Sequence, residues 1–453
     1  MPFPHAPARA LAQAALSLLL CACLGLQPQA GAQALPWVTA WEAAPQSIPQ
    51  GAGVPAFRRT APLRDQTLRL VLVPELSGSV LRVRISNRWG ERALRIGAAG
   101  VALAGADGSI LVPPAAGEGP GSPRSRTPAP AMLRFGGQRQ VVIAPHAEIW
   151  SDPLPWPVQA GRALAISLYL PRPTVPGTWH RLASQVQFIS RPGDHVTDAC
   201  ASAFPSRITS YLWLDRVDLR PAAPSGALVA IGDSITDGMR STLNARRSWP
   251  QQLAQRLRVD GVHDLSVVNA GISGGRLLSD SACWGPPLLQ RFDRDALSVA
   301  SARAVVVLIG INDIDFAHTP QRRGLDCDAP HLHVDAALLE QGLATLAREA
   351  HARGLRAYVG TLTPASLPAS SEALRGQLNA WIRSQRDFDG VIDFDAVLRD
   401  PRHPSRMLPR LDSGDHLHPS DAGYAAMAAA ALPPALREAA ALRNPVEAAP
   451  SSR

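Results

Sequence analysis

The feature that most constrains this fold is the alternation of apolar runs with helical stretches between residues 226 and 436. Apolar runs typical of buried strands occupy residues 227–231, 265–268, 304–309, 355–359 and 391–393. Helical stretches lie between and after them, at residues 249–257, 334–352, 371–385 and 419–432. Strands joined by helices predict an α/β architecture, a parallel sheet covered by helices on both faces.

The preceding part of the chain has a different pattern. Residues 80–85 alternate apolar and polar side chains, the period of a half-buried strand, and residues 68–73, 141–143 and 164–170 are similar. Clusters of glycine and proline separate these runs. We therefore expect a β-rich, sandwich or jelly-roll-like domain over residues 35–221, joined by a Pro/Ala linker to an α/β domain over residues 226–436. Residues 437–453 are expected to form a flexible C-terminal tail.

The first 34 residues have the pattern of a secretory signal peptide. Arg9 precedes an apolar stretch at residues 11–26, and the small residues Ala30, Ala32 and Ala34 offer cleavage sites. This start predicts a secreted or periplasmic bacterial protein; a lipoprotein attached through Cys21 or Cys23 is the less favoured alternative. No later stretch is apolar and long enough to suggest a stable membrane span.

Charge excludes one large class of partner. The chain of 453 residues carries a formal net charge of +8 and contains no lysine, so its 45 basic residues are all arginine. These arginines are scattered, whereas a nucleic-acid-binding surface requires them to cluster. We expect no nucleic-acid partner.

Three cysteines remain after the signal peptide, and oxidising conditions outside the cytoplasm would allow a disulfide. Cys283 and Cys327 lie in polar, loop-like segments and are the favoured pair, which would leave Cys200 free. The acidic and histidine residues at 326–333 have poor zinc-ligand spacing, and the chain has no CxxC motif. We expect no metal and no cofactor.

Four short motifs carry the candidate chemistry. The first strand runs into a Gly-Asp-Ser sequence that contains Ser234, the second into a glycine-rich segment that contains Gly274, and the third is followed by Asn312. Near the C-terminal end, Asp415 and His418 stand three residues apart. Because ligands bind at the carboxyl ends of parallel strands, the first three motifs are expected to meet at one edge of the sheet.

The residue types predict nucleophilic catalysis. Ser234 would attack a carbonyl, His418 would take its proton, and Asp415 would orient the imidazole. His416 and Asp412 compete for the last two roles, but the Asp-x-x-His spacing favours Asp415 and His418. A Gly-x-Ser-x-Gly nucleophile elbow is excluded because Thr236 occupies the place of its last glycine.

Taken together in this order, the four motifs resemble those of the SGNH or GDSL hydrolases, over about residues 226–436. The resemblance implies a flavodoxin-like three-layer α/β/α domain and metal-free ester hydrolysis. It also implies a catalytic triad of Ser234, Asp415 and His418, and an oxyanion hole formed by Ser234, Gly274 and Asn312. The chain has Ile235 where many members of the family have leucine.

An exported β-rich domain before such a domain resembles the arylesterase and xylan-esterase-like branch of the family. We therefore expect a secreted serine esterase that hydrolyses short-acyl esters, either acetyl groups on carbohydrate or aryl esters. The partner would be a small-molecule or polysaccharide ester. Two alternatives stay open: acyl transfer by the same triad, and a non-catalytic polysaccharide- or cell-wall-binding protein. Exposed tryptophans among Trp41, Trp89, Trp179 and Trp213 would favour carbohydrate binding, whereas buried ones would belong to the core.

Overall fold

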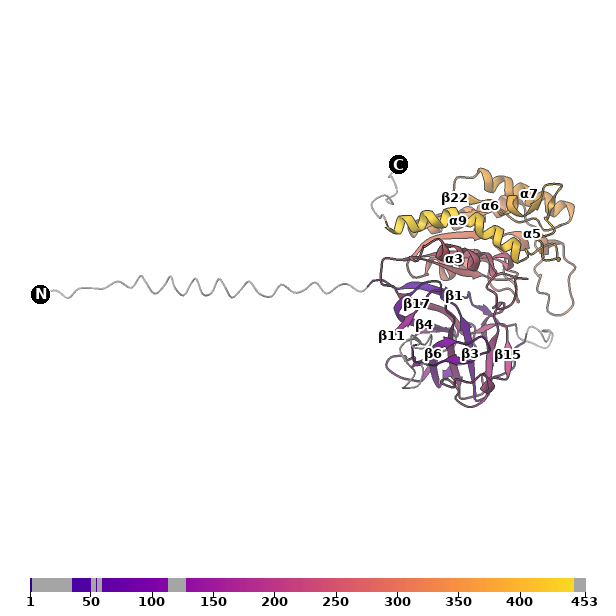
Figure 1. Ribbon diagram of the computed structural model, residues 1–453. Coiled ribbons are helices and arrows are strands. Elements are labelled where there is room, and N and C mark those ends of the chain that lie inside the picture. The colour runs from indigo at the N-terminus through magenta and orange to yellow at the C-terminus, as the bar shows by residue number, and fades with distance from the viewer. Residues whose placement is uncertain (2–34, 50–53, 55–58, 113–127, 444–453) are drawn as a thin grey trace. The chain divides into compact units, whose positions relative to one another are not determined.

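A computed structural model describes residue 1 and residues 35–49, 54, 59–112 and 128–443 (Figure 1). Residues 2–34 of the predicted signal peptide and the last ten residues of the predicted tail lie outside the described residues. No helix in the described part of the chain combines the length and apolarity needed to cross a bilayer.

The first half is built from antiparallel sheets, as its alternating pattern predicts. One sheet has the order β1-β17-β4-β10, with β11 also paired to β4; its strands are β1 (Val38–Glu42), β4 (Gly78–Ser86), β10 (Glu148–Trp150), β11 (Leu154–Val158) and β17 (Leu214–Arg220). The other has the order β15-β14-β3-β12-β6-β7, with β8 paired to β6; its strands are β3 (Gln66–Leu72), β6 (Ala98–Ala104), β7 (Ile110–Leu111), β8 (Ala131–Met132), β12 (Leu164–Leu170), β14 (Gln187–Pro192) and β15 (Ser206–Ile208). Smaller ladders join β2 (Gln46–Ser47), β13 (Thr178–His180) and β16 (Tyr211–Leu212), and β5 (Leu94–Ile96) with β9 (Val141–Ile143).

The second half contains the predicted parallel sheet. Its order is β19-β18-β20-β21-β22, formed by β18 (Gly226–Gly232), β19 (Leu265–Gly271), β20 (Ala302–Leu308), β21 (Arg356–Gly360) and β22 (Gly390–Ile392). Strands β18 to β21 are mostly buried, which explains why they are largely apolar in the sequence, whereas the edge strand β22 is partly exposed. The chain leaves β18 first toward β19 and later toward β20, so the strand order reverses beside β18.

Helices cover this sheet in two layers. Helix α3 (Trp249–Val259) connects β18 to β19 and packs against α9 (Asp421–Arg443). Helices α6 (Ala336–Ala352) and α7 (Ala369–Ser384) connect the strands on the other side of β18 and pack against each other. Parallel crossovers are right-handed, so connections that run in opposite directions place their helices on opposite faces. Shorter elements are α2 (Ser234–Asp237), α4 (Leu288–Phe292), α5 (Ile311–Asp315), α8 (Phe394–Leu398), β23 (Arg399–Asp400) and β24 (His403–Met407).

Helix α9 extends beyond the predicted helix end at residue 432 and the predicted domain boundary at residue 436. Pro433 and Pro434 lie inside it, yet the helix continues to Arg443. Ala435, Glu438 and Ala439 are buried, and Glu438 accepts a hydrogen bond of 2.6 Å from the hydroxyl of Tyr358. Packing of this face thus holds the helix together despite the two missing backbone donors, and residues 437–443 belong to the folded structure.

The strands on the two sides of the predicted linker belong to one compact unit, residues Pro36–Arg453. Ala43, next to β1, forms a parallel bridge with Asn269 of β19. Arg216 of β17 donates to Glu42 at 2.6 Å and to the carbonyl oxygens of Arg294 and Ser298. Burial raises the pKa of Glu42 to about 7, against the opposing charge of Arg216. Arg216, paired with Glu42 inside the β-rich half, therefore joins that half to the α/β half through its bonds to the carbonyl oxygens of Arg294 and Ser298.

This ion pair makes a stability prediction. Arg216→Met should lower the free energy of unfolding by about 3–5 kcal/mol, because it leaves the buried side chain of Glu42 without its partner. Urea denaturation of the intact chain measures the effect. The matched control is Arg353→Met, which breaks a pair with Asp293 whose side chains are 55% and 64% exposed and should cost less than about 1 kcal/mol. Equal losses in the two variants would contradict the assigned role of Arg216.

Candidate active site

Three of the four motifs follow parallel strands and meet where the strand order reverses. Ser234 opens α2 directly after β18, Gly274 lies three residues beyond β19, and Asn312 lies in the first turn of α5 after β20. The fourth motif, with Asp415 and His418, lies in the turn before α9. The site is therefore assembled from four separate segments of the chain.

The strand-to-helix turn fixes the position of Ser234. Asp233 caps α2, since its side chain accepts a hydrogen bond of 3.0 Å from the backbone N–H of Ile235. A β-carbon at Gly232 would overlap the carbonyl oxygen of Leu308 on β20, so only glycine fits there. Burial raises the pKa of Asp233 to about 7. The capping residue Asp233 is thus fully buried, and only 5% of Ser234 is exposed.

A continuous hydrogen-bonded chain joins Ser234, His418 and Asp415. The Nε2 atom of His418 lies 2.9 Å from the hydroxyl oxygen of Ser234, and its Nδ1 atom lies 2.8 Å from Oδ2 of Asp415. The other carboxylate oxygen of Asp415 accepts the backbone N–H groups of Leu417 and His418. An ionised Asp415 can only accept, so Nδ1 carries the proton and Nε2 is free to accept the serine hydrogen.

The neighbouring groups favour an ionised Asp415 and a neutral His418. Burial opposes ionisation of Asp415, but hydrogen bonds from the backbone and ring of His418 hold its pKa well below its usual value. Burial of the His418 ring lowers the pKa of His418, although the neighbouring carboxylate opposes the shift. His418 is therefore neutral at neutral pH and able to act as a base.

Arg240 is a residue of this site that no sequence motif indicated. Its Nε donates to Oδ2 of Asp415 at 2.9 Å, the same oxygen that accepts from His418. The side chain of Arg240 is 59% exposed, and its positive charge contributes to the lowered pKa of His418. The arginine and the aspartate are 175 residues apart in sequence, so only the fold brings them together.

Candidate donors to an oxyanion come from the second and third motifs. Gly274 adopts a left-handed conformation with φ of 76°, and a β-carbon there would overlap the ring of Trp284. The amide nitrogen of Asn312 donates one hydrogen to the carbonyl oxygen of Gly275 at 2.9 Å, which leaves its second hydrogen for a ligand. The predicted residues Gly274 and Asn312 are thus joined through the backbone of one glycine-rich turn.

Comparison with protein families decides the class of the second half. Residues 230–426 match the family described as GDSL-like lipase/acylhydrolase. The C-terminal half of this chain is a GDSL-like acylhydrolase domain. The family consists of carboxylic ester hydrolases, so the chain carries an enzyme domain of that class.

Solved structures with similarity to the GDSL domain come from several bacteria. A lipase/acylhydrolase from Enterococcus faecalis is 18% identical, with a TM-score of 0.36, and the match covers 47% of this chain and 96% of that one. A GDSL-like lipase from Bacteroides thetaiotaomicron is 17% identical, with a TM-score of 0.33, covering 47% and 88%. A variant of an acetyl xylan esterase from Geobacillus stearothermophilus is 23% identical, with a TM-score of 0.36, covering 48% and 96%. A search of curated proteins found no match.

His416 and Asp412, the alternatives to His418 and Asp415, form a separate pair in the GDSL domain. His416 bonds through Nδ1 to Asp412 at 2.7 Å, and its side chain is 68% exposed. His331 similarly pairs with Asp326 at 2.8 Å. Within the described ranges, no group of three or more histidine, cysteine, aspartate or glutamate residues is arranged to hold a metal ion.

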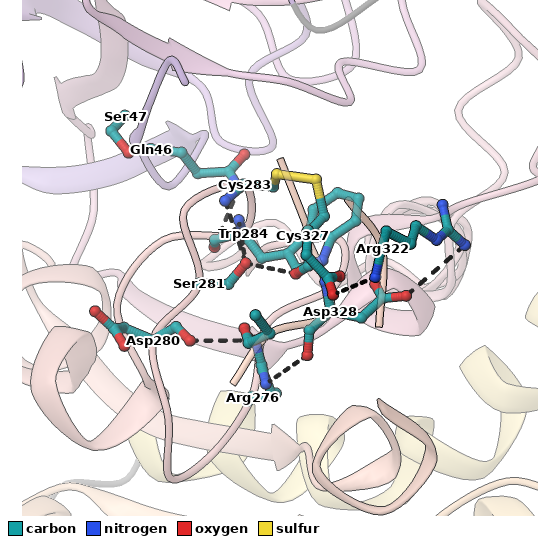
Figure 2. The surroundings of a disulfide bond; sticks show 12 residues. Gln46, Ser47, Arg276, Asp280, Ser281, Cys283, Trp284, Arg322, Cys327 and Asp328 are labelled. Atoms are coloured by element: carbon teal, nitrogen blue, oxygen red, sulfur yellow. Dashed lines mark hydrogen bonds and ion pairs between the residues drawn. A yellow bond between two sulfur atoms is a disulfide. The ribbon is translucent and has the colours of Figure 1, made fainter. Parts of the chain in front are cut away.

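The predicted disulfide is confirmed beside the oxyanion segment of the GDSL domain. Cys283 and Cys327 are bonded, with their α-carbons 5.1 Å apart, and Cys200 is free and exposed. Figure 2 shows the neighbouring contacts: the hydroxyl of Ser281 donates to the carbonyl oxygen of Cys327 at 2.7 Å. The disulfide thus ties the 281–285 loop, which carries Trp284 over Gly274, to the segment that follows α5.

Two charged residues that border this segment have structural roles in the GDSL domain. Asp313 accepts the backbone N–H groups of Leu277 and Leu278, and burial raises its pKa to about 6. Arg276 donates to the carbonyl oxygens of Asp280 and Asp328, as Figure 2 shows. Both side chains therefore hold the backbone that follows Gly274.

Proposed function

We propose that this protein is a serine esterase in which Ser234, His418 and Asp415 form the catalytic triad. The observation that carries the proposal is the unbroken chain of hydrogen bonds from Ser234 through His418 to Asp415. The arrangement meets the requirement for a nucleophile within reach of a base that a third group orients.

In the proposed reaction, His418 takes the hydroxyl proton as Ser234 attacks the ester carbonyl. The backbone N–H groups of Ser234 and Gly274 and the side-chain amide of Asn312 donate to the developing oxyanion. The protonated His418 then gives its proton to the leaving alcohol, and an acyl-enzyme remains. Water, deprotonated by His418, releases the acid and restores the serine.

A groove of about 520 Å³ supports a carbohydrate as the alcohol part of the substrate. Trp89, a half-buried residue of the β-rich half, lines it together with polar side chains that include Arg88, Asp280 and Gln290. An aromatic side chain beside hydrogen-bonding groups is a combination suited to a sugar. The groove is also lined by Ser281 and Gly285, whose loop carries Trp284 over Gly274. Trp179 and Trp213 are buried and belong to the core.

Comparing turnover of acetylated oligosaccharides, aryl acetates and longer acyl esters tests the proposed substrate. We expect acetyl esters to be hydrolysed faster than long acyl esters, and Trp89→Ala to raise KM for the oligosaccharide alone. Preference for long acyl chains, or equal effects of Trp89→Ala on an aryl acetate, would contradict the assignment of short-acyl carbohydrate esters.

The pH dependence of the reaction follows from His418. Since His418 must be neutral to accept a proton, kcat/KM should fall as pH decreases through its pKa. Burial lowers that pKa, so the midpoint should lie below the value of about 6.5 typical of a free histidine. Arg240→Gln removes a positive charge and should move the midpoint to higher pH.

A pH series with an aryl acetate measures both midpoints. Arg353→Gln, a change at an exposed ion pair, serves as the control and should leave the profile unchanged. A midpoint above that of free histidine in the wild type, or identical profiles for the two arginine variants, would contradict the proposed role of His418 and Arg240.

We further propose that the protein is exported. The proposal rests on the sequence pattern of the first 34 residues and on the Cys283–Cys327 disulfide, a bond that persists in oxidising compartments. Amino-terminal sequencing of the mature protein recovered from outside the cytoplasm would test it, with cleavage expected near Ala32 or Ala34. An intact amino terminus on a protein retained in the cytoplasm would contradict it.

A further inference from the structure

A buried polar chain leads from the β-rich half to the glycine-rich segment of the active site. Nε2 of His180, the last residue of β13, lies 3.1 Å from Oδ1 of Asp237, the last residue of α2. The other carboxylate oxygen of Asp237 accepts the backbone N–H and the hydroxyl of Ser273 at 2.9 and 2.7 Å. Ser273 immediately precedes Gly274. His180, Asp237 and Ser273 are buried, with exposed fractions of 6%, 7% and 4%, respectively.

The neighbours of the His180 ring indicate its protonation state. Nδ1 lies 2.9 Å from the carbonyl oxygen of Ala44, and Nε2 lies 2.9 Å from the carbonyl oxygen of Leu182 as well as near Asp237. The two carbonyl oxygens can only accept hydrogen bonds, and so can Asp237 when it is ionised. Both nitrogens of the His180 ring must therefore donate. His180 is therefore an imidazolium that forms a buried ion pair with Asp237. Burial opposes this charge, but Asp237 and the two carbonyl oxygens raise the pKa of His180 above its usual value.

Asp237 connects His180 to the helix that carries Ser234 and to the turn that carries Gly274. It ends the short helix that Ser234 begins. A β-carbon at Gly271, the last residue of β19, would overlap the backbone nitrogen of Asp237, so the strand end and the helix are in direct contact. The carboxylate of Asp237 then holds Ser273 at the start of the turn that contains Gly274.

We propose that His180 is a positioning residue for the oxyanion hole, acting through Asp237 and Ser273 on the backbone N–H of Gly274. The inference rests on the proposed function and gives the β-rich half a defined part in it: this half supplies the cation that fixes the oxyanion segment. A donor aimed at a developing oxyanion stabilises the transition state more than the bound ester. Loss of the cation should therefore act on kcat and leave KM nearly unchanged.

The test measures how fast an alkyl fluorophosphonate reacts with Ser234 in the intact chain. The reaction is followed by the mass of the intact protein. Its amplitude gives the fraction of chains that can react, and its rate gives the reactivity of Ser234 in those chains. His180→Gln should slow labelling by about 10- to 100-fold at nearly full amplitude, since a single displaced donor costs up to about 10²–10³ in rate. With an aryl acetate, kcat per labelled site should fall by a similar factor, whereas KM should change by less than about 3-fold.

Two further variants complete the design. Asp237→Asn keeps the shape of the side chain but removes its charge; it should reproduce the effect of His180→Gln, and the double variant should be no slower than the slower single variant. His195→Gln is the matched control, because His195 forms a histidine–aspartate pair with Asp198 at 2.7 Å in the same half of the protein. It should label at the wild-type rate. If His180→Gln does not fold, Asp237→Asn decides the outcome alone.

The possible failures are distinguishable. A wild-type rate with reduced amplitude, or an unchanged rate and kcat, would show that the pair serves folding alone and would overturn the inference while leaving the proposed function intact. A loss confined to KM would also overturn it. A wild-type protein whose Ser234 does not react would overturn the proposed function and this inference with it.

Discussion

Ser234→Ala is expected to lower kcat by about 10⁴-fold or more, because triad members act as a unit and the remaining groups cannot form an acyl-enzyme. Removing the hydroxyl of Ser234 takes away its hydrogen bond to the side chain of His418. This change should leave the fold intact. Initial rates with an aryl acetate measure the loss, and circular dichroism together with urea denaturation establishes that the variant is folded.

Ser225→Ala is the matched control for this change. Ser225 lies in the segment between β17 and β18, and its hydroxyl bonds to the carbonyl oxygen of Ala223. This variant should keep wild-type activity. Near-normal turnover by a folded Ser234→Ala variant would remove the serine from the mechanism.

Asn312→Ala is expected to lower kcat by about 10²–10³-fold, the effect typical of removing one oxyanion donor. KM should change much less, because the amide acts mainly on charge that develops in the transition state. Since the same amide nitrogen also bonds to the carbonyl oxygen of Gly275, the variant should also lose about 1–3 kcal/mol of stability.

Expressing kcat per phosphonate-reactive site separates catalysis from stability in this variant. Asn379→Ala provides a control, since its buried amide likewise bonds to a backbone carbonyl, that of Leu362, but lies outside the proposed site. It should lose stability with little change in kcat per site. An effect of Asn312→Ala on KM alone would make Asn312 a substrate-binding residue.

Local patterns in the sequence predicted much of this architecture. Continuous apolar runs marked β18–β22 because strands buried on both faces contain few polar residues. The Gly-Asp-Ser turn, the glycine-rich turn and Asn312 were found because each directly follows such a strand or lies within a few residues of its end. The Asp-x-x-His spacing identified the pair Asp415 and His418 over the neighbouring His416 and Asp412. In the structure His418 contacts Ser234, whereas His416 pairs with Asp412.

Contacts between distant segments could not be predicted in the same way. Arg240 reaches Asp415, and His180 reaches Asp237, only because the sheets place them together. Neither pair forms a local sequence pattern. The end of α9 was also missed, because two adjacent prolines normally end a helix, whereas burial of Ala435 and Ala439 carries this one further.

Locating the phosphonyl group after stoichiometric reaction with a fluorophosphonate tests the central claim most directly. The account predicts one group per chain, on Ser234, with esterase activity lost in proportion to labelling. Modification of a different residue, or full activity in a chain labelled at Ser234, would contradict it.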